Sequence, residues 1–284
     1  MLKKHLLLLL ALLGGVGGFV LRSWQLQSAF EPYTGLPISG APSTIAISLF
    51  SLVMAALLAL LCYRGRSAEA TYDQEQSNRS FLVLLVTCLA GGATAVAAFG
   101  FFQKGTLMQQ IQGSSPLLIY LFALLTLGSA GAFLLIAFRR YQQKPQLNSL
   151  ALLLPSFSGC LWLMVSYQRL AGDPFVTDYI FQLFAIMSGM LAHYFIASHS
   201  FQTQRSTAIC ATSGLAIYFS LTALAYAPFT ADGFLCMAQV LYFAATLWLL
   251  SRQDPSLQPM NDNASAETTS AGEVQYHPLK EENP

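Results

Sequence analysis

The pattern along the chain is one of long apolar runs separated by short polar or charged segments. A helix of about 20 apolar residues crosses the roughly 30 Å hydrocarbon core of a bilayer. The runs predict eight transmembrane helices, at residues 6–24, 43–63, 81–102, 116–138, 149–167, 179–198, 206–226 and 234–250. Membrane barrels are built from alternating segments of about 10 residues, whereas these runs are continuous. The predicted fold is therefore all-α, a polytopic transmembrane helical bundle of about eight spans within residues 1–252.

The first span has a second interpretation. Lys3 and Lys4 precede the apolar stretch 6–13, as in the beginning of a secretory signal peptide. A cleavage site needs small residues, and the nearest candidate, Gln27-Ser28-Ala29, begins with Gln. We therefore expect a retained span. Cleavage would instead leave seven spans and place the new amino terminus on the outer side of the membrane.

The positive charges predict the orientation. With the amino terminus inside, eleven of the fourteen Lys and Arg residues fall in inner segments, as the positive-inside rule requires. An even number of spans then places the carboxyl terminus inside as well.

Residues 253–284 contain six acidic side chains against Lys280 alone and are rich in Pro, Ser, Thr and Asn. This composition predicts a disordered, acidic cytoplasmic tail.

Composition narrows the class of protein. Charged residues make up 10% of the chain, whereas soluble domains carry about 25%. The hydrophobic fraction of 55% agrees with a bundle that has the lipid bilayer as its surroundings. The net charge is +1 and no basic stripe is present, so we expect no nucleic-acid partner. Small-residue seams such as Gly14-x-x-x-Gly18 and Gly189 with Ala192 fit packing inside the bundle, with a membrane-protein partner or a second copy as alternatives.

Neutral polar residues gather in the carboxyl-terminal half of the predicted bundle. They are the candidates for a polar cavity in spans five to eight that opens to the outside: Gln182, His193, Tyr218, Gln239, Ser158 and Tyr167. Pro155 frees a backbone carbonyl in the same region. Hydrogen bonds between helices are the alternative explanation for these side chains.

No cofactor or metal is expected. His193 and His199 are six residues apart, which does not place both on one helical face, and no other span contains a histidine. The five cysteines fall on five different spans, without the spacing of a zinc or iron–sulfur site. Span centres hold no Asp, Glu, Lys or Arg, which argues against ion-coupled transport.

The loop between the first two spans is the most distinctive segment. Residues 30–42 hold three prolines and two glycines, a composition typical of defined turns. We interpret the loop as a rigid connection or, alternatively, as an outer contact surface formed by Arg22, Trp24, Glu31 and Tyr33. The loop and the preceding sequence 21–26 resemble uncharacterised polytopic membrane proteins of clostridia-like bacteria over about the first 60 residues. The resemblance implies a bacterial plasma (inner) membrane and no particular activity.

Three functions fit these observations. The first is a non-catalytic sensor, scaffold or partner subunit that uses the outer loop and the tail as contacts. The second is a permease for a small molecule or lipid that uses the polar cavity. The third is a membrane anchor subunit with a quinone site at His193. The chain contains no hydrolase, phosphate-loop or metalloprotease motif, and we expect that it is not an enzyme.

Overall fold

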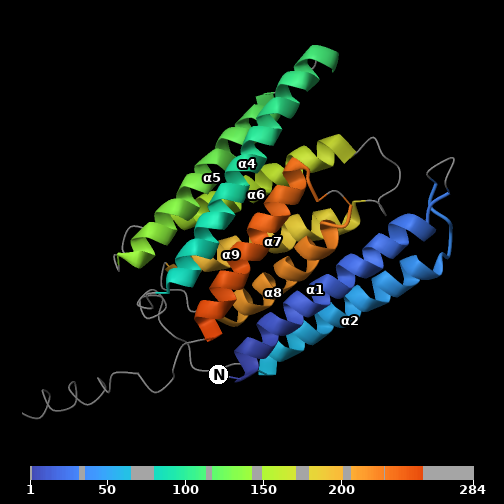
Figure 1. Ribbon diagram of the computed structural model, residues 1–284, viewed down its shortest axis with the longest axis horizontal. Helices are drawn as coiled ribbons and strands as arrows, with labels where there is room; N and C mark the ends of the chain where they lie inside the picture. The colour runs from blue at the N-terminus through green and yellow to red at the C-terminus, as the bar shows by residue number, and fades with distance from the viewer. Residues whose placement is uncertain are drawn as a thin grey trace, which may run out of the picture. The chain divides into compact units, whose positions relative to one another are not determined.

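The computed structural model describes residues 2–31, 36–64, 80–112, 117–142, 149–170, 179–200, 206–226 and 228–251. Over these ranges the fold is all-α, with eight helices and no strand. They are α1 (Leu2–Ser28), α2 (Pro42–Arg64), α4 (Phe81–Gln112), α5 (Leu117–Tyr141), α6 (Ser149–Leu170), α7 (Ile180–Ser200), α8 (Ser206–Ala223) and α9 (Ala231–Ser251) (Figure 1). All eight are long and apolar enough to cross a membrane, which confirms the spans predicted for this part of the chain.

Several helix ends differ from the predicted ones by three residues or more, and two of them have a local explanation. Helix α4 continues to Gln112 instead of ending near residue 102, and Lys104 forms an ion pair with Asp232 at 3.5 Å. A helix that leaves the hydrocarbon can continue in water, so hydropathy alone marks its end too early. Helix α9 begins at Ala231 instead of residue 234, because the Thr230 hydroxyl accepts a hydrogen bond from the Gly233 N–H at 3.2 Å and caps the helix.

Six helices pack in a closed order around a common interior. Each helix from α4 to α8 packs on the next helix in the chain, and α9 packs on α4, which closes the order. We call this arrangement the six-helix ring. Its core joins Phe101, Phe122, Trp162, Ile186 and Leu235, which come from five of the six helices.

The hairpin of α1 and α2 packs outside the six-helix ring. Helix α1 contacts α8 and α9, and α2 contacts α1 and α8, as the neighbouring blue and orange ribbons in Figure 1 show. Glycines permit this close approach: a Cβ on Gly15 would lie 2.5 Å from Leu221 Cδ1, and one on Gly18 would lie 2.3 Å from Thr222 Oγ1. In the membrane-crossing part of α9, 67% of the residues are buried inside the protein, against 22% in α2. Helix α9 is therefore central and α2 peripheral.

The chain divides into two units, Met1–Gln253 and Asp254–Pro284. The helices belong to the first unit. The predicted acidic tail makes up the second unit and lies outside the described residues.

Candidate functional site: a polar cavity inside the ring

A small cavity lies inside the six-helix ring, near the middle of the helices that surround it. It holds about 40 Å³, room for roughly three water molecules and far less than a drug-sized ligand needs. Helices α4, α5, α6, α7 and α9 all contribute to its wall. The wall consists of Thr94, Ser129, Phe133, Pro155, Ser158, Gly159, Trp162, Met190, His193, Leu235, Ala238 and Gln239. Half of these side chains carry a hydrogen-bonding group, and none of the twelve is Asp, Glu, Lys or Arg.

His193 is held in the wall by aromatic packing. Its ring centroid lies 5.7 Å from that of Phe133, 5.1 Å from that of Tyr242 and 4.6 Å from that of Phe243. The imidazole is 6% exposed. A neutral imidazole offers one N–H donor and one acceptor nitrogen, and His193 is one of the side chains that line the cavity.

Two residues orient the Gln239 side chain: Ser220 on α8, by a hydrogen bond, and Gly189 on α7, which leaves room for the amide. Its Oε1 atom accepts a hydrogen bond from the buried Ser220 hydroxyl at 2.8 Å. The amide lies against Gly189, where an added Cβ would be only 2.1 Å from Nε2. Gly189 therefore makes the space that the Gln239 amide fills.

The wall hydroxyls donate to partners within the protein and keep acceptor capacity. Thr94 donates to the Ala90 carbonyl at 2.8 Å, and Ser129 donates to the Leu125 carbonyl at 2.9 Å. Ser158 lies 3.2 Å from the hydroxyl oxygen of Thr126. A hydroxyl that donates its proton still presents oxygen lone pairs. Together with the Gln239 amide and the His193 ring, these oxygens suit a neutral molecule that both donates and accepts hydrogen bonds.

Trp162 connects the cavity to a charged pair at one end of the bundle. This side chain lines the cavity, and its Nε1 donates to Asp232 Oδ1 at 2.9 Å. The other Asp232 oxygen lies 3.5 Å from Lys104 Nζ, and these two side chains are 13% and 42% exposed. Lys104 also lies over the Phe101 ring at 5.1 Å. Polar contacts thus lead from the cavity to the end of the bundle where α4 ends and α9 begins, the predicted outer end.

Three of the six residues predicted for a polar cavity come together in it: Ser158, His193 and Gln239. The cavity is not confined to spans five to eight, because α4 and α5 supply Thr94 and Ser129 and α8 supplies no wall residue.

The other three residues lie elsewhere. Tyr218 is buried outside the ring interior, where its hydroxyl lies 2.7 Å from that of Ser51 on α2. Gln182 lies eleven residues from His193 on the same helix, a separation of about 16 Å along its axis. Tyr167 is 68% exposed near the end of α6, a position typical of an interfacial aromatic ring.

The residues predicted for the outer contact surface differ in exposure. Arg22 is buried, with its guanidinium donating to Gln25 and lying 5.2 Å from the centre of the Phe181 ring, so it supports helix packing instead of an external contact. Trp24 is 47% exposed and Glu31 is also exposed. Tyr33 lies outside the described residues.

Sequence reasoning missed Thr94, Ser129 and the Trp162–Asp232–Lys104 contacts. Thr94 and Ser129 stand among Gly and Ala residues, where a single hydroxyl gives little signal. Asp232 falls just before the predicted last span and so counts as part of a loop. Its position in the first turn of α9, where a helix favours negative charge, could have drawn attention to it.

Comparison with protein-family models, with curated proteins and with solved structures found no match. Among the described residues, no group of three His, Cys, Asp or Glu side chains could hold a metal ion.

Proposed function

We propose that this membrane protein is a permease for small, neutral, polar solutes, with the six-helix ring as the carrier and its cavity as the solute site. The observation that carries the proposal is an uncharged polar cavity near the middle of five membrane-crossing helices. Buried polar groups are costly in lipid unless something satisfies them. The wall hydroxyls already donate within the protein, and a hydrogen-bonding solute that passes through the ring would use the acceptor capacity that they keep.

The chemistry of the wall limits the class of solute. Without a carboxylate, Lys or Arg in the wall, a charged solute would receive no counter-charge and would lose its hydration at high cost. Amides and polyols donate and accept hydrogen bonds without charge, as the Gln239 amide and the wall hydroxyls require. Urea and glycerol are the simplest probes of this class.

The size of the cavity limits which solutes fit this conformation. A volume of about 40 Å³ fits water-sized groups, so passage of a larger solute requires the helices to separate. We place this opening at Trp162, which lines the cavity and is tied to Asp232. Breaking that single hydrogen bond and moving the indole would join the cavity to the solvent beyond Lys104.

Flux in liposomes tests the proposal. Purified protein reconstituted in liposomes is expected to speed the entry of urea or glycerol above that of protein-free liposomes, measured by stopped-flow light scattering. Gln239→Leu removes the amide at similar volume and should slow entry about tenfold, the effect of one lost hydrogen bond of about 1.4 kcal/mol. Tyr218→Phe removes a buried hydroxyl outside the cavity and should leave entry within about twofold. Entry of both solutes at the protein-free rate would refute the proposal.

A contact function at the turn between α1 and α2 is the second candidate. The turn is held by an antiparallel bridge between Phe30 and Pro37, with Ile38 N–H donating to the Ala29 carbonyl at 2.7 Å. Leu36 and Ile38 are 43% and 45% exposed. Exposed apolar side chains beside this bridge favour a sensor or partner subunit that is contacted at this end of the bundle.

A further inference from the structure

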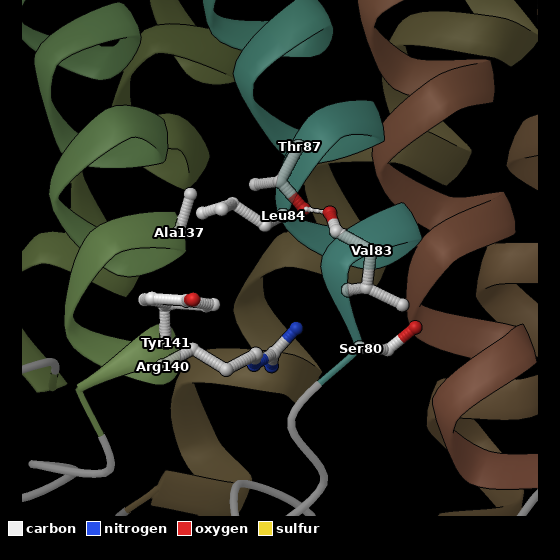
Figure 2. Close-up of a pocket in the computed structure, with 7 residues that line it drawn as sticks. All are labelled: Ser80, Val83, Leu84, Thr87, Ala137, Arg140 and Tyr141. Atoms are coloured by element: carbon white, nitrogen blue, oxygen red, sulfur yellow. Dashed lines mark hydrogen bonds between the residues drawn. The ribbon is translucent and has the colours of Figure 1, made fainter.

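A notch between the beginning of α4 and the end of α5 combines a basic side chain with the amino terminus of a long helix. Its wall consists of Ser80, Val83, Leu84, Thr87, Ala137, Arg140 and Tyr141. Figure 2 shows the Arg140 side chain extending from α5 into the space beside α4. This end of the bundle is the predicted cytoplasmic face, opposite the Lys104–Asp232 pair.

The guanidinium group in the notch lacks a partner for one of its donors. Arg140 Nε is buried and makes no hydrogen bond within the described part of the chain. A buried, charged donor that is left unsatisfied is costly. Arg140 therefore favours an anion in the notch that accepts its N–H group.

The first turn of α4 lies beside the same notch. The opening N–H groups of a helix have no acceptor within it, and its amino terminus carries a partial positive charge. Ser80 directly precedes α4 and lines the notch. A phosphate group accepts hydrogen bonds from guanidinium groups and helix amino termini alike.

The notch lies between the ends of two helices that are long and apolar enough to cross a membrane, α4 and α5. The acyl chains of a phospholipid would lie along these helices while its headgroup phosphate reaches Arg140. A free phosphate ion would make no such contact with the helices.

We propose that the notch between α4 and α5 binds the phosphate of an anionic phospholipid. Basic pockets between membrane helices on the cytoplasmic side bind anionic headgroups in this way. The site is separate from the cavity inside the ring, because the two share no wall residue. Its occupation would tie α4 to α5 at the end away from Trp162.

Native mass spectrometry of the purified full-length protein tests this site. With equal amounts of phosphatidylglycerol and phosphatidylcholine added, the wild-type protein is expected to retain phosphatidylglycerol preferentially. Arg140→Gln should lower that retention about tenfold, the loss of one charge-assisted hydrogen bond of about 1.4 kcal/mol. Arg64→Gln is the matched control, since Arg64 is exposed at the same end of the bundle and lies outside the notch.

Three outcomes would overturn the proposal. They are equal retention of the two lipids by the wild-type protein, unchanged phosphatidylglycerol retention in Arg140→Gln, and an equal loss in Arg64→Gln. The wild-type lipid preference needs no variant, so it tests the site even where Arg140→Gln does not fold. Inorganic phosphate is expected to displace little phosphatidylglycerol, and full displacement at millimolar phosphate would indicate a site for the free ion instead.

Discussion

At the scale of single residues, the wall of the cavity depends on a missing side chain, at Gly189, as much as on the polar side chains that line it. Gly189 leaves the space in which the Gln239 amide lies, and Ser220 fixes that amide from α8. The sequence marks Gly189 only as one member of a small-residue seam. Its particular importance follows from a neighbour on α9 that no spacing along the chain predicts.

Gly189→Ala tests this relation. The added Cβ would lie 2.1 Å from Gln239 Nε2, so the amide must move and lose its bond to Ser220, at a cost of about 1–3 kcal/mol. We expect a lower melting temperature in detergent. Gly131→Ala, whose Cβ would meet nothing within 4 Å, is the control and should not lower it.

A second substitution tests the cause of that loss. Gln239→Ala combined with Gly189→Ala removes the clash, so the double variant should lose less stability than the two single losses added together. Simple addition of the two losses would show that Gly189 serves some other contact.

Three of the six residues predicted for a polar cavity line the same cavity, for a physical reason. Ser158, His193 and Gln239 are polar side chains near the middle of apolar helices, and such groups turn toward the protein interior. Tyr218 is also a polar side chain near the middle of an apolar helix. It is buried between α8 and the hairpin of α1 and α2, where its hydroxyl contacts that of Ser51. Hydropathy gives the depth of a side chain and leaves open which neighbouring helix it faces.

At the scale of elements, the bundle consists of the six-helix ring and an added hairpin. The hairpin of α1 and α2 packs mainly on α8, through Gly15, Gly18 and the Tyr218–Ser51 contact. The number of helices could be predicted from the length of the apolar runs. Their packing order could not, because α4 meets α9 across more than a hundred residues of chain.

Gly15→Val tests the separation of hairpin and ring. A Cβ at this position would lie 2.5 Å from Leu221 Cδ1, and overpacking of this kind costs about 1–3 kcal/mol. The melting temperature should fall, while solute entry per folded molecule stays at the wild-type rate because the cavity lies in the ring. Gly17→Ala, which meets only the end of the Phe50 ring at 3.2 Å, is the milder control. A loss of entry beyond the loss of folded protein would mean that the hairpin belongs to the carrier.

At the scale of the whole molecule, membrane crossing and solute passage make different demands on the chain. Crossing needs only length and apolar composition, and eight helices of the described part meet both requirements. Passage needs a polar interior that solvent can reach. The inside–inside orientation stays a prediction of the positive charges, and it would place Trp162 and Lys104 toward the outside.

Thiol labelling of the cavity is the most direct test of the permease. In lipid nanodiscs, Ser129→Cys is expected to react with a small, uncharged, water-soluble methanethiosulfonate reagent faster than the wild-type background, and the transported solute should slow that reaction. Ser213→Cys is the matched control, because Ser213 is equally buried, lies on α8 and is not part of the wall. Reaction at Ser129→Cys alone would support a solvent-accessible cavity. Background rates at both positions, or equal rates above background, would contradict it.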